Sequence, residues 1–168
     1  MGRTNKIVDE AGNFTEDTRL VLFLKKAEIS YKVGTYNLNL GLIGMNTYGV
    51  QEKNWGYRFI EKSALDKNKF TPTTDLGISI SKKIMNAISL SIQYVNGEGY
   101  NSPESDYIQK LNFNITYGQK NLLKNNGANV GLVYSANLTD DTPIRMYSLF
   151  SGVAFQKFRL GLDLDFLD

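Results

Sequence analysis

Hydrophobic and polar residues alternate along much of this chain, and the alternation is clearest between residues 75 and 95. In the first half of this stretch Leu76, Ile78 and Ile80 are separated by glycine and serine, and residues 88–95 repeat the pattern after a short break. Side chains along a β-strand point to its two faces in turn. The pattern therefore predicts a β-hairpin with one apolar face and one polar face.

The same two-residue period recurs before and after this hairpin. It predicts about eight strands in all, at residues 19–33, 36–42, 75–83, 88–95, 107–118, 128–138, 144–155 and 158–166. The alternation is cleanest in the last stretch and poorest in 144–155. We therefore predict an all-β fold, an antiparallel up-and-down meander that is part of a transmembrane β-barrel or a closed small version of one, with residues 1–168 as a single segment.

The connections between these strands differ in length. Those after the first, third and seventh strands are short, whereas those after the second, fourth and sixth cover residues 46–73, 96–106 and 139–143. Short turns on one rim and longer loops on the other are typical of outer-membrane β-barrels. Strands of about 11 residues, tilted by about 40°, span roughly the 25 Å apolar band of such a barrel. Tyrosines at or near strand ends match its aromatic girdles: Tyr31, Tyr36, Tyr94, Tyr107, Tyr117 and Tyr134.

Alternation alone does not say which face of the sheet points inward. A soluble, lipocalin-like eight-stranded barrel that binds a small apolar ligand is the alternative, and it requires Leu160, Leu162 and Leu164 to line an interior pocket. Two features favour the membrane: the polar faces are mostly serine, asparagine and glycine rather than lysine and glutamate, and the apolar faces are uniformly large. An outer-membrane enzyme or adhesin on a small barrel is a third class, without a catalytic constellation to support it.

The composition argues against several other classes of function. The chain has no histidine and no cysteine, so it lacks the commonest zinc ligand, the usual general base and any thiol nucleophile. We predict no catalytic residues, metal or cofactor. The formal charge of +2 comes without a block of lysine and arginine, so no nucleic-acid partner is predicted. No apolar run could form a signal peptide or a transmembrane helix, so the sequence is cytosolic, or the mature or internal part of a longer protein.

Four segments in order resemble the Gram-negative outer-membrane porins, in the group that includes the phosphate-selective type. They are Gly41-Leu-Ile-Gly-Met45, Trp55-Gly-Tyr-Arg-Phe59 with Glu61-Lys62, Asp75-Leu-Gly-Ile-Ser79 and residues 95–104. The likeness covers about residues 20–118. It implies a barrel of sixteen or more strands in the bacterial outer membrane, in contact with lipid, usually homotrimeric, conducting small hydrophilic solutes or ions. Eight strands are about half of such a barrel, so we expect an internal piece of a porin.

The face of the predicted sheet on which a residue lies predicts whether its side chain would line such a channel. The expected lumen-side charges are Lys26, Glu28, Lys32, Asp75, Lys83, Lys110, Arg145, Arg159, Asp163 and Asp165. Residues 46–73 form a long loop, and folded inward as a constriction it would present Arg58, Glu61 and Lys62 to the pore. The alternatives are that the charges are only the solvated face of a sheet, and that Trp55, Tyr57 and Phe59 only pack on the rim. The near balance of lumen charges does not indicate phosphate selectivity and leaves the solute open.

Overall fold

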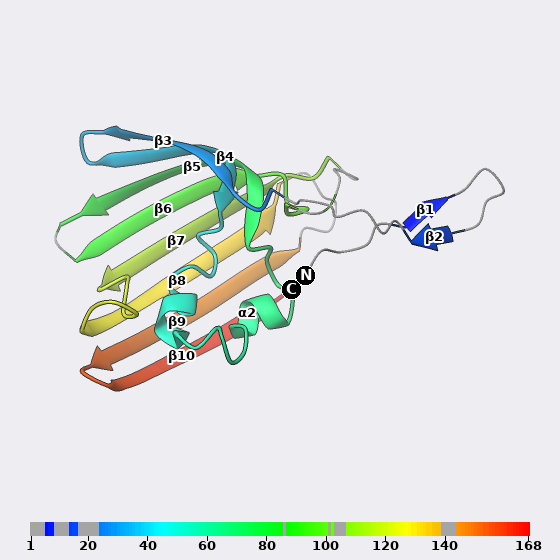
Figure 1. The fold of residues 1–168 in the computed structure, drawn as a ribbon. Coiled ribbons are helices and arrows are strands. Elements are labelled where there is room, and N and C mark those ends of the chain that lie inside the picture. Colours follow the sequence, from blue (N-terminus) through cyan, green and yellow to red (C-terminus); the bar gives the residue numbers. More distant parts are fainter. Residues whose placement is uncertain are drawn as a thin grey trace.

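A computed structural model describes residues 6–8, 14–16, 24–85, 87–100, 102, 107–138 and 144–168. Within them eight strands form one antiparallel sheet whose spatial order follows the chain from β3 to β10 (Figure 1). The strands are β3 (Ala27–Val33), β4 (Tyr36–Gly44), β5 (Thr74–Ile84), β6 (Ile88–Val95), β7 (Lys110–Gly118), β8 (Gly127–Asn137), β9 (Arg145–Phe155) and β10 (Phe158–Leu167). Two short strands, β1 (Lys6–Val8) and β2 (Phe14–Glu16), pair with each other. The predicted all-β meander is confirmed.

The eight-stranded sheet is open. Among the described residues each strand pairs antiparallel with its neighbours in sequence, and β3 and β10 form the two edges. The closed small barrel, one of the two predicted forms, is therefore not the form that this structure takes. Because the number of strands is even, β3 and β10 run in opposite directions.

Short turns and long connections lie at opposite ends of the strands, as predicted (Figure 1). A two-residue turn joins Val33 to Tyr36, and another joins Phe155 to Phe158. Gly34 adopts φ +56° in the first of these turns, a conformation that glycine takes without steric cost. The long connection between β4 and β5, residues 45–73, is named here the β4–β5 loop.

The first strand starts later than predicted. It begins at Ala27, after non-strand residues 24–26, and predicted residues 19–23 lie outside the described part of the chain. Residues 56–63 of the β4–β5 loop form no helix. Two helices flank that stretch instead, α1 (Gln51–Trp55) and α2 (Ala64–Lys67). Gly56 ends α1, since it adopts φ +69° and its N–H donates to the Glu52 carbonyl. No described helix is long and apolar enough to cross a membrane.

The two faces of the sheet differ in chemistry and in exposure. We call one the apolar face; its large side chains are exposed and include Leu40, Ile78, Ile80, Ile92, Leu132, Leu149, Leu160, Leu162 and Leu164. We call the other the polar face; its side chains are buried and include Ser79, Ser91, Gln93, Asn112, Asn114, Thr116, Asn129 and Ser148. Leu160, Leu162 and Leu164 therefore do not line an interior, which the lipocalin-like alternative requires.

Packing under the β4–β5 loop explains the poor alternation of β9. Met146 and Phe150 point to the polar face, where they form a small buried cluster with Val50, Leu65 and Val133. Val50 and Leu65 belong to the loop, while Val133 lies on β8. Strand β9 is apolar on both faces because one faces outward and the other meets the loop.

Candidate functional site

The β4–β5 loop folds across the polar face of the sheet and carries α1 and α2 with it (Figure 1). Helix α1 lies against β9 and β10, at the far side of the sheet from the strand that starts the loop. Polar groups of the loop form hydrogen bonds with side chains of four strands, β6 to β9. These contacts form two groups, which fix the path of the loop.

Asn46 ties the start of the loop to β6 and β7. Its backbone N–H donates to Gln93 Oε1 (2.8 Å), and its side-chain amide donates to the Ser91 carbonyl (3.1 Å) and to Ser91 Oγ (3.0 Å). Its own carbonyl accepts from Asn114 Nδ2 at 2.9 Å. Ser91, Gln93 and Asn114 on the polar face therefore each have a partner in the loop.

Helix α1 is held to β8 and β9 by amides. Asn54 and Asn129 exchange two hydrogen bonds of 2.8 Å each, and Gln51 Nε2 donates to Ser148 Oγ at 3.3 Å. The backbones approach closely because Gly152 lies beneath the helix. A Cβ there would lie 2.6 Å from Asn54 Cγ, too close for any larger residue without movement.

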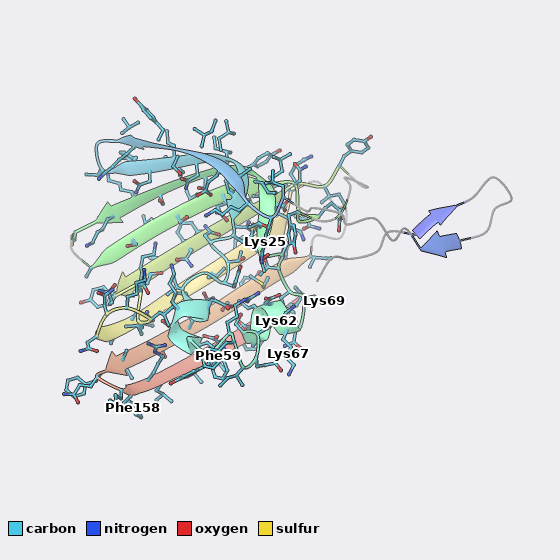
Figure 2. The ribbon with its side chains drawn as sticks, viewed as in Figure 1. Lys25, Phe59, Lys62, Lys67, Lys69 and Phe158 are labelled. Atoms are coloured by element: carbon cyan, nitrogen blue, oxygen red, sulfur yellow. The ribbon has the colours of Figure 1, made fainter. Side chains whose placement is uncertain are left out.

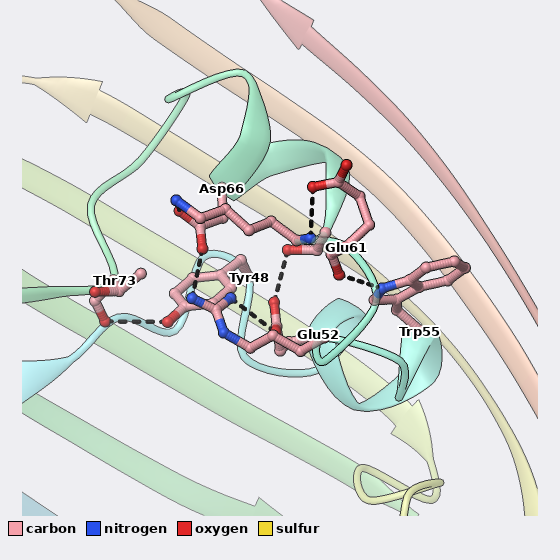
Figure 3. A network of polar contacts seen from close by, with 9 residues as sticks. Tyr48, Glu52, Trp55, Glu61, Asp66 and Thr73 are labelled. Carbon is pink, nitrogen blue, oxygen red and sulfur yellow. Dashed lines mark hydrogen bonds and ion pairs between the residues drawn. The ribbon is translucent and has the colours of Figure 1, made fainter. Parts of the chain in front are cut away.

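Arg58 is the centre of an ion-pair network within the loop. Figure 3 labels its two carboxylate partners, Glu52 and Asp66. Its guanidinium lies 2.8 Å from Glu52 Oε1 and 2.7 Å from Asp66 Oδ2, and Glu52 also accepts from Ser63 Oγ at 2.7 Å. The hydrogen bond to Glu52 is the largest cause that raises the pKa of Arg58 above its ordinary value. Lys62 Nζ lies 3.6 Å from Asp66. The network joins α1 to α2 and rigidifies the loop.

Two further groups of the loop have shifted pKa values. Burial raises the pKa of Tyr48 to about 12, and its hydroxyl donates to the Thr73 carbonyl at 3.3 Å. The pKa of Glu61 is lowered, first by the hydrogen bond from the Lys62 N–H and then by Lys67, whose Nζ lies 3.1 Å away. Trp55 Nε1 donates to the Glu61 carbonyl at 2.8 Å, which fixes the indole beside the loop.

The predicted constriction residues are together in this loop, but they are not equivalent. Arg58 is paired with two carboxylates, whereas Glu61 and Lys62 are more exposed. The aromatic residues among them, Trp55, Tyr57 and Phe59, form a chain of edge-to-face contacts with centroids 5.6 and 6.1 Å apart.

Most of the predicted lumen-side charges lie on the polar face. Register places Glu28, Lys32, Lys83, Lys110, Arg159, Asp163 and Asp165 on that face, with Lys26 beside Glu28 at 3.0 Å. Arg159 donates to the Leu122 carbonyl at 2.8 Å and lies over the Tyr57 ring, 6.0 Å from its centroid.

Two of these residues have other positions. Arg145 shares the apolar face with Tyr147, so its predicted facing is wrong; it is the first residue of β9, where a long cation reaches past the apolar band. Asp75 is buried, 2% exposed, and accepts from the backbone N–H groups of Leu76 (2.8 Å) and Gly97 (2.6 Å). It therefore fixes the β6–β7 connection rather than a channel wall.

Cavities open on the polar face and beside the loop. One of about 530 Å³ lies between the second half of the β4–β5 loop and residues that include Gly97, Tyr100 and Lys110, and Figure 2 labels four of its lysines, Lys25, Lys62, Lys67 and Lys69. Two smaller ones, about 310 and 290 Å³, lie toward the short-turn end and share Lys120.

Sequence reasoning missed five of the lysines at these cavities: Lys25, Lys53, Lys67, Lys69 and Lys120. They lie in loops, turns and the two short helices, where no strand period assigns a facing. The described residues include no group of histidine, cysteine, aspartate and glutamate side chains that could hold a metal ion.

No protein-family model, curated protein or solved structure matches this chain.

Proposed function

We propose that this chain forms part of the wall of an outer-membrane, porin-like β-barrel that lets small hydrophilic solutes or ions diffuse passively. The observation that carries the proposal is the inverted sheet: large hydrophobic side chains are exposed, and polar side chains lie beneath a loop that folds across their face. An interior that is polar and an exterior that is apolar characterise transmembrane barrels.

The distribution of aromatic side chains on the apolar face supports contact with lipid. Toward the short-turn end the outward aromatics are Tyr31, Tyr36, Tyr117, Phe155 and Phe158, and toward the long-loop end they are Tyr94, Tyr134, Tyr147 and Phe166. Leucine, isoleucine and valine dominate the band between. Two aromatic girdles around an aliphatic band are the pattern of a membrane-facing barrel surface.

A lysine at one girdle fits the same reading. Lys82 lies on the apolar face near the short-turn end, with its Nζ 4.4 Å from the Tyr36 ring centroid and 2.9 Å from the Tyr36 hydroxyl. Lysines reach from the edge of an apolar band to the headgroup region in this way. An exposed apolar face that covers a whole sheet exceeds what a water-soluble surface normally carries.

The two edge strands of the sheet need partners if the chain is to span a lipid bilayer. Unpaired N–H and C=O groups at a sheet edge are not tolerated in the hydrocarbon region, so β3 and β10 require partner strands. Such strands come from a second copy of this chain or from a longer reading frame that contains it. Sixteen strands would enclose an aqueous path, which eight cannot.

Planar-bilayer conductance tests the proposal. The 168-residue chain and the longest reading frame that contains it are refolded in detergent and reconstituted side by side. Stable, stepwise conductance from either one supports the proposal: steps from the chain itself indicate assembly of copies, and steps from the longer frame alone indicate closure within one polypeptide. Silence from both, with the chain monomeric in water without detergent, would overturn it.

A further inference from the structure

We infer that the polar face selects for small anions, with two basic clusters placed along it, one at each end. The inference deepens the proposed function and rests on it, because ion selectivity requires that ions pass along the polar face. Its evidence is the spatial distribution of charge, which differs from the near balance expected from the sequence.

The first cluster surrounds the cavity of about 530 Å³. Six cationic side chains and two carboxylates are among its described lining residues: Lys25, Arg58, Lys62, Lys67, Lys69 and Lys110, with Asp66 and Glu98. Asp66 is already engaged by Arg58 at 2.7 Å and by Lys62 at 3.6 Å. Cationic side chains therefore outnumber carboxylates in the described part of this lining.

Among the described residues, no carboxylate lies within ion-pair distance of Lys25, Lys69 or Lys110. Lys25 lies over the Tyr100 ring, 5.7 Å from its centroid, and Lys110 donates weakly to the Gly97 carbonyl at 3.5 Å. All three lysines line the cavity, so their positive charge attracts an entering anion.

The second cluster lies toward the short-turn end. Lys53, Lys83 and Lys120 line the two smaller cavities, and no carboxylate is among the described residues that line them. The other polar side chains of the 310 Å³ cavity are hydroxyls and amides, such as those of Ser91 and Asn114. Hydroxyls and amide N–H groups can donate to an anion, so the whole lining suits one.

Lys53 and Lys120 repel each other across this second cluster. Lys120 is half-buried, and both this burial and the neighbouring charge of Lys53 lower its pKa. Two like charges that are partly removed from water, without a described carboxylate beside them, are stabilised by an anion bound between them. A solvated lysine on an open sheet face would gain little from the same anion.

The predicted lumen carboxylates lie outside these clusters, although Asp75 interacts electrostatically with Lys110. Glu28 is paired with Lys26 at an edge strand, Asp75 is buried against backbone amides, and Asp163 and Asp165 lie on the other edge strand, β10. None of the four lines any of the three cavities. Cationic and acidic residues that nearly balance in the sequence therefore lie in different places on the polar face.

Ion selectivity of the conducting assembly tests the inference. The reversal potential in a potassium chloride gradient gives the ratio of chloride to potassium permeability. We expect a ratio above one, and a fall of several-fold in the double variant Lys53→Gln/Lys120→Gln with steps still present. The matched control is Lys124→Gln/Lys157→Gln, which removes two exposed lysines from turns at the same end of the sheet and should leave the ratio unchanged. A wild-type ratio at or below one, or equal changes in both variants, would overturn the inference.

Sulfate binding keeps the inference testable if no conductance is found. Calorimetric titration of the detergent-refolded chain with sodium sulfate should show binding that weakens several-fold in Lys53→Gln/Lys120→Gln and not in the control. Binding without conductance would refute the porin proposal and retain the anion site. Conductance without sulfate binding and without anion preference would refute the anion site and retain the porin proposal.

Discussion

Replacing Leu132 by arginine tests whether the exposed apolar face contacts lipid. Leu132 lies midway along β8, is 54% exposed, and has Ile115 and Leu149 as its cross-strand neighbours on the same face. Its side chain covers no cavity and supports no part of the β4–β5 loop. The substitution therefore places a charge in the medium that surrounds the apolar face, while the packing inside the fold is unchanged.

The magnitude depends on the depth of the residue in the bilayer. An arginine on the lipid face costs about 2–4 kcal/mol at the midplane and about 0–1 kcal/mol near the interface. Ala128 lies on the same face four residues closer to the short-turn end. That separation corresponds to roughly 10 Å along the membrane normal for a strand rising about 3.3 Å per residue and tilted by about 40°. Ala128→Arg is thus the matched control, since it adds the same charge to the same strand and face.

Equilibrium urea unfolding of the lipid-reconstituted protein measures the effect. The fluorescence of Trp55, the one tryptophan of the chain, reports the transition. We expect Leu132→Arg to lower the free energy of unfolding by about 2–4 kcal/mol and Ala128→Arg by about 0–1 kcal/mol. On a water-exposed surface both changes would lie within about 0.5 kcal/mol of zero. Equal, small effects from the two variants would refute the lipid-facing assignment.

Three further predictions concern the loop and the face beneath it. Gly131→Ala should destabilise the fold by about 1–3 kcal/mol in the same urea assay, because the added Cβ would lie 2.3 Å from Phe150 Cζ; an unchanged midpoint would contradict the close packing. Asn129→Ala leaves the buried Asn54 amide without its partner, a loss of about 1–3 kcal/mol, and limited proteolysis should cut the β4–β5 loop faster while the sheet resists; uniform cleavage would argue against a docked loop. An unfolded tyrosine ionises near pH 10, whereas the pKa of Tyr48 is about 12 in the fold, so stability present below pH ~10 falls by about 2–3 kcal/mol as the pH rises to ~12. Tyr48→Phe should remove that part of the pH dependence, and parallel pH profiles of the two proteins would refute it.

The sheet was predictable from the sequence because each strand carries its own two-residue period. Leu76, Ile78 and Ile80 share a face whatever the neighbouring strands do, and short turns such as Gly34-Thr35 set the pairing order. The period fails where both faces are covered by apolar surroundings, as on β9, whose Met146 and Phe150 meet the loop. Local pattern therefore gave the strands, and tertiary packing decided the exception.

The candidate site was less predictable, because its residues belong to segments without a period. Arg58, Glu61 and Lys62 were located in the right loop, but the partners of Arg58 depend on how α1 and α2 pack. The environment of Lys120 includes Lys53, which is 67 positions away in the sequence and lines the same cavity. No spacing rule joins two residues that meet only after a loop has crossed a sheet.

The route of the β4–β5 loop also sets an order of events during folding. Gln51 bonds to Ser148, 97 positions later in the chain, and Asn54 bonds to Asn129, 75 positions later. Contacts between such distant positions form slowly, since the intervening chain must first be ordered. The loop therefore docks after β8 and β9 have joined the sheet. Until that step the part of the polar face beneath the loop stays uncovered.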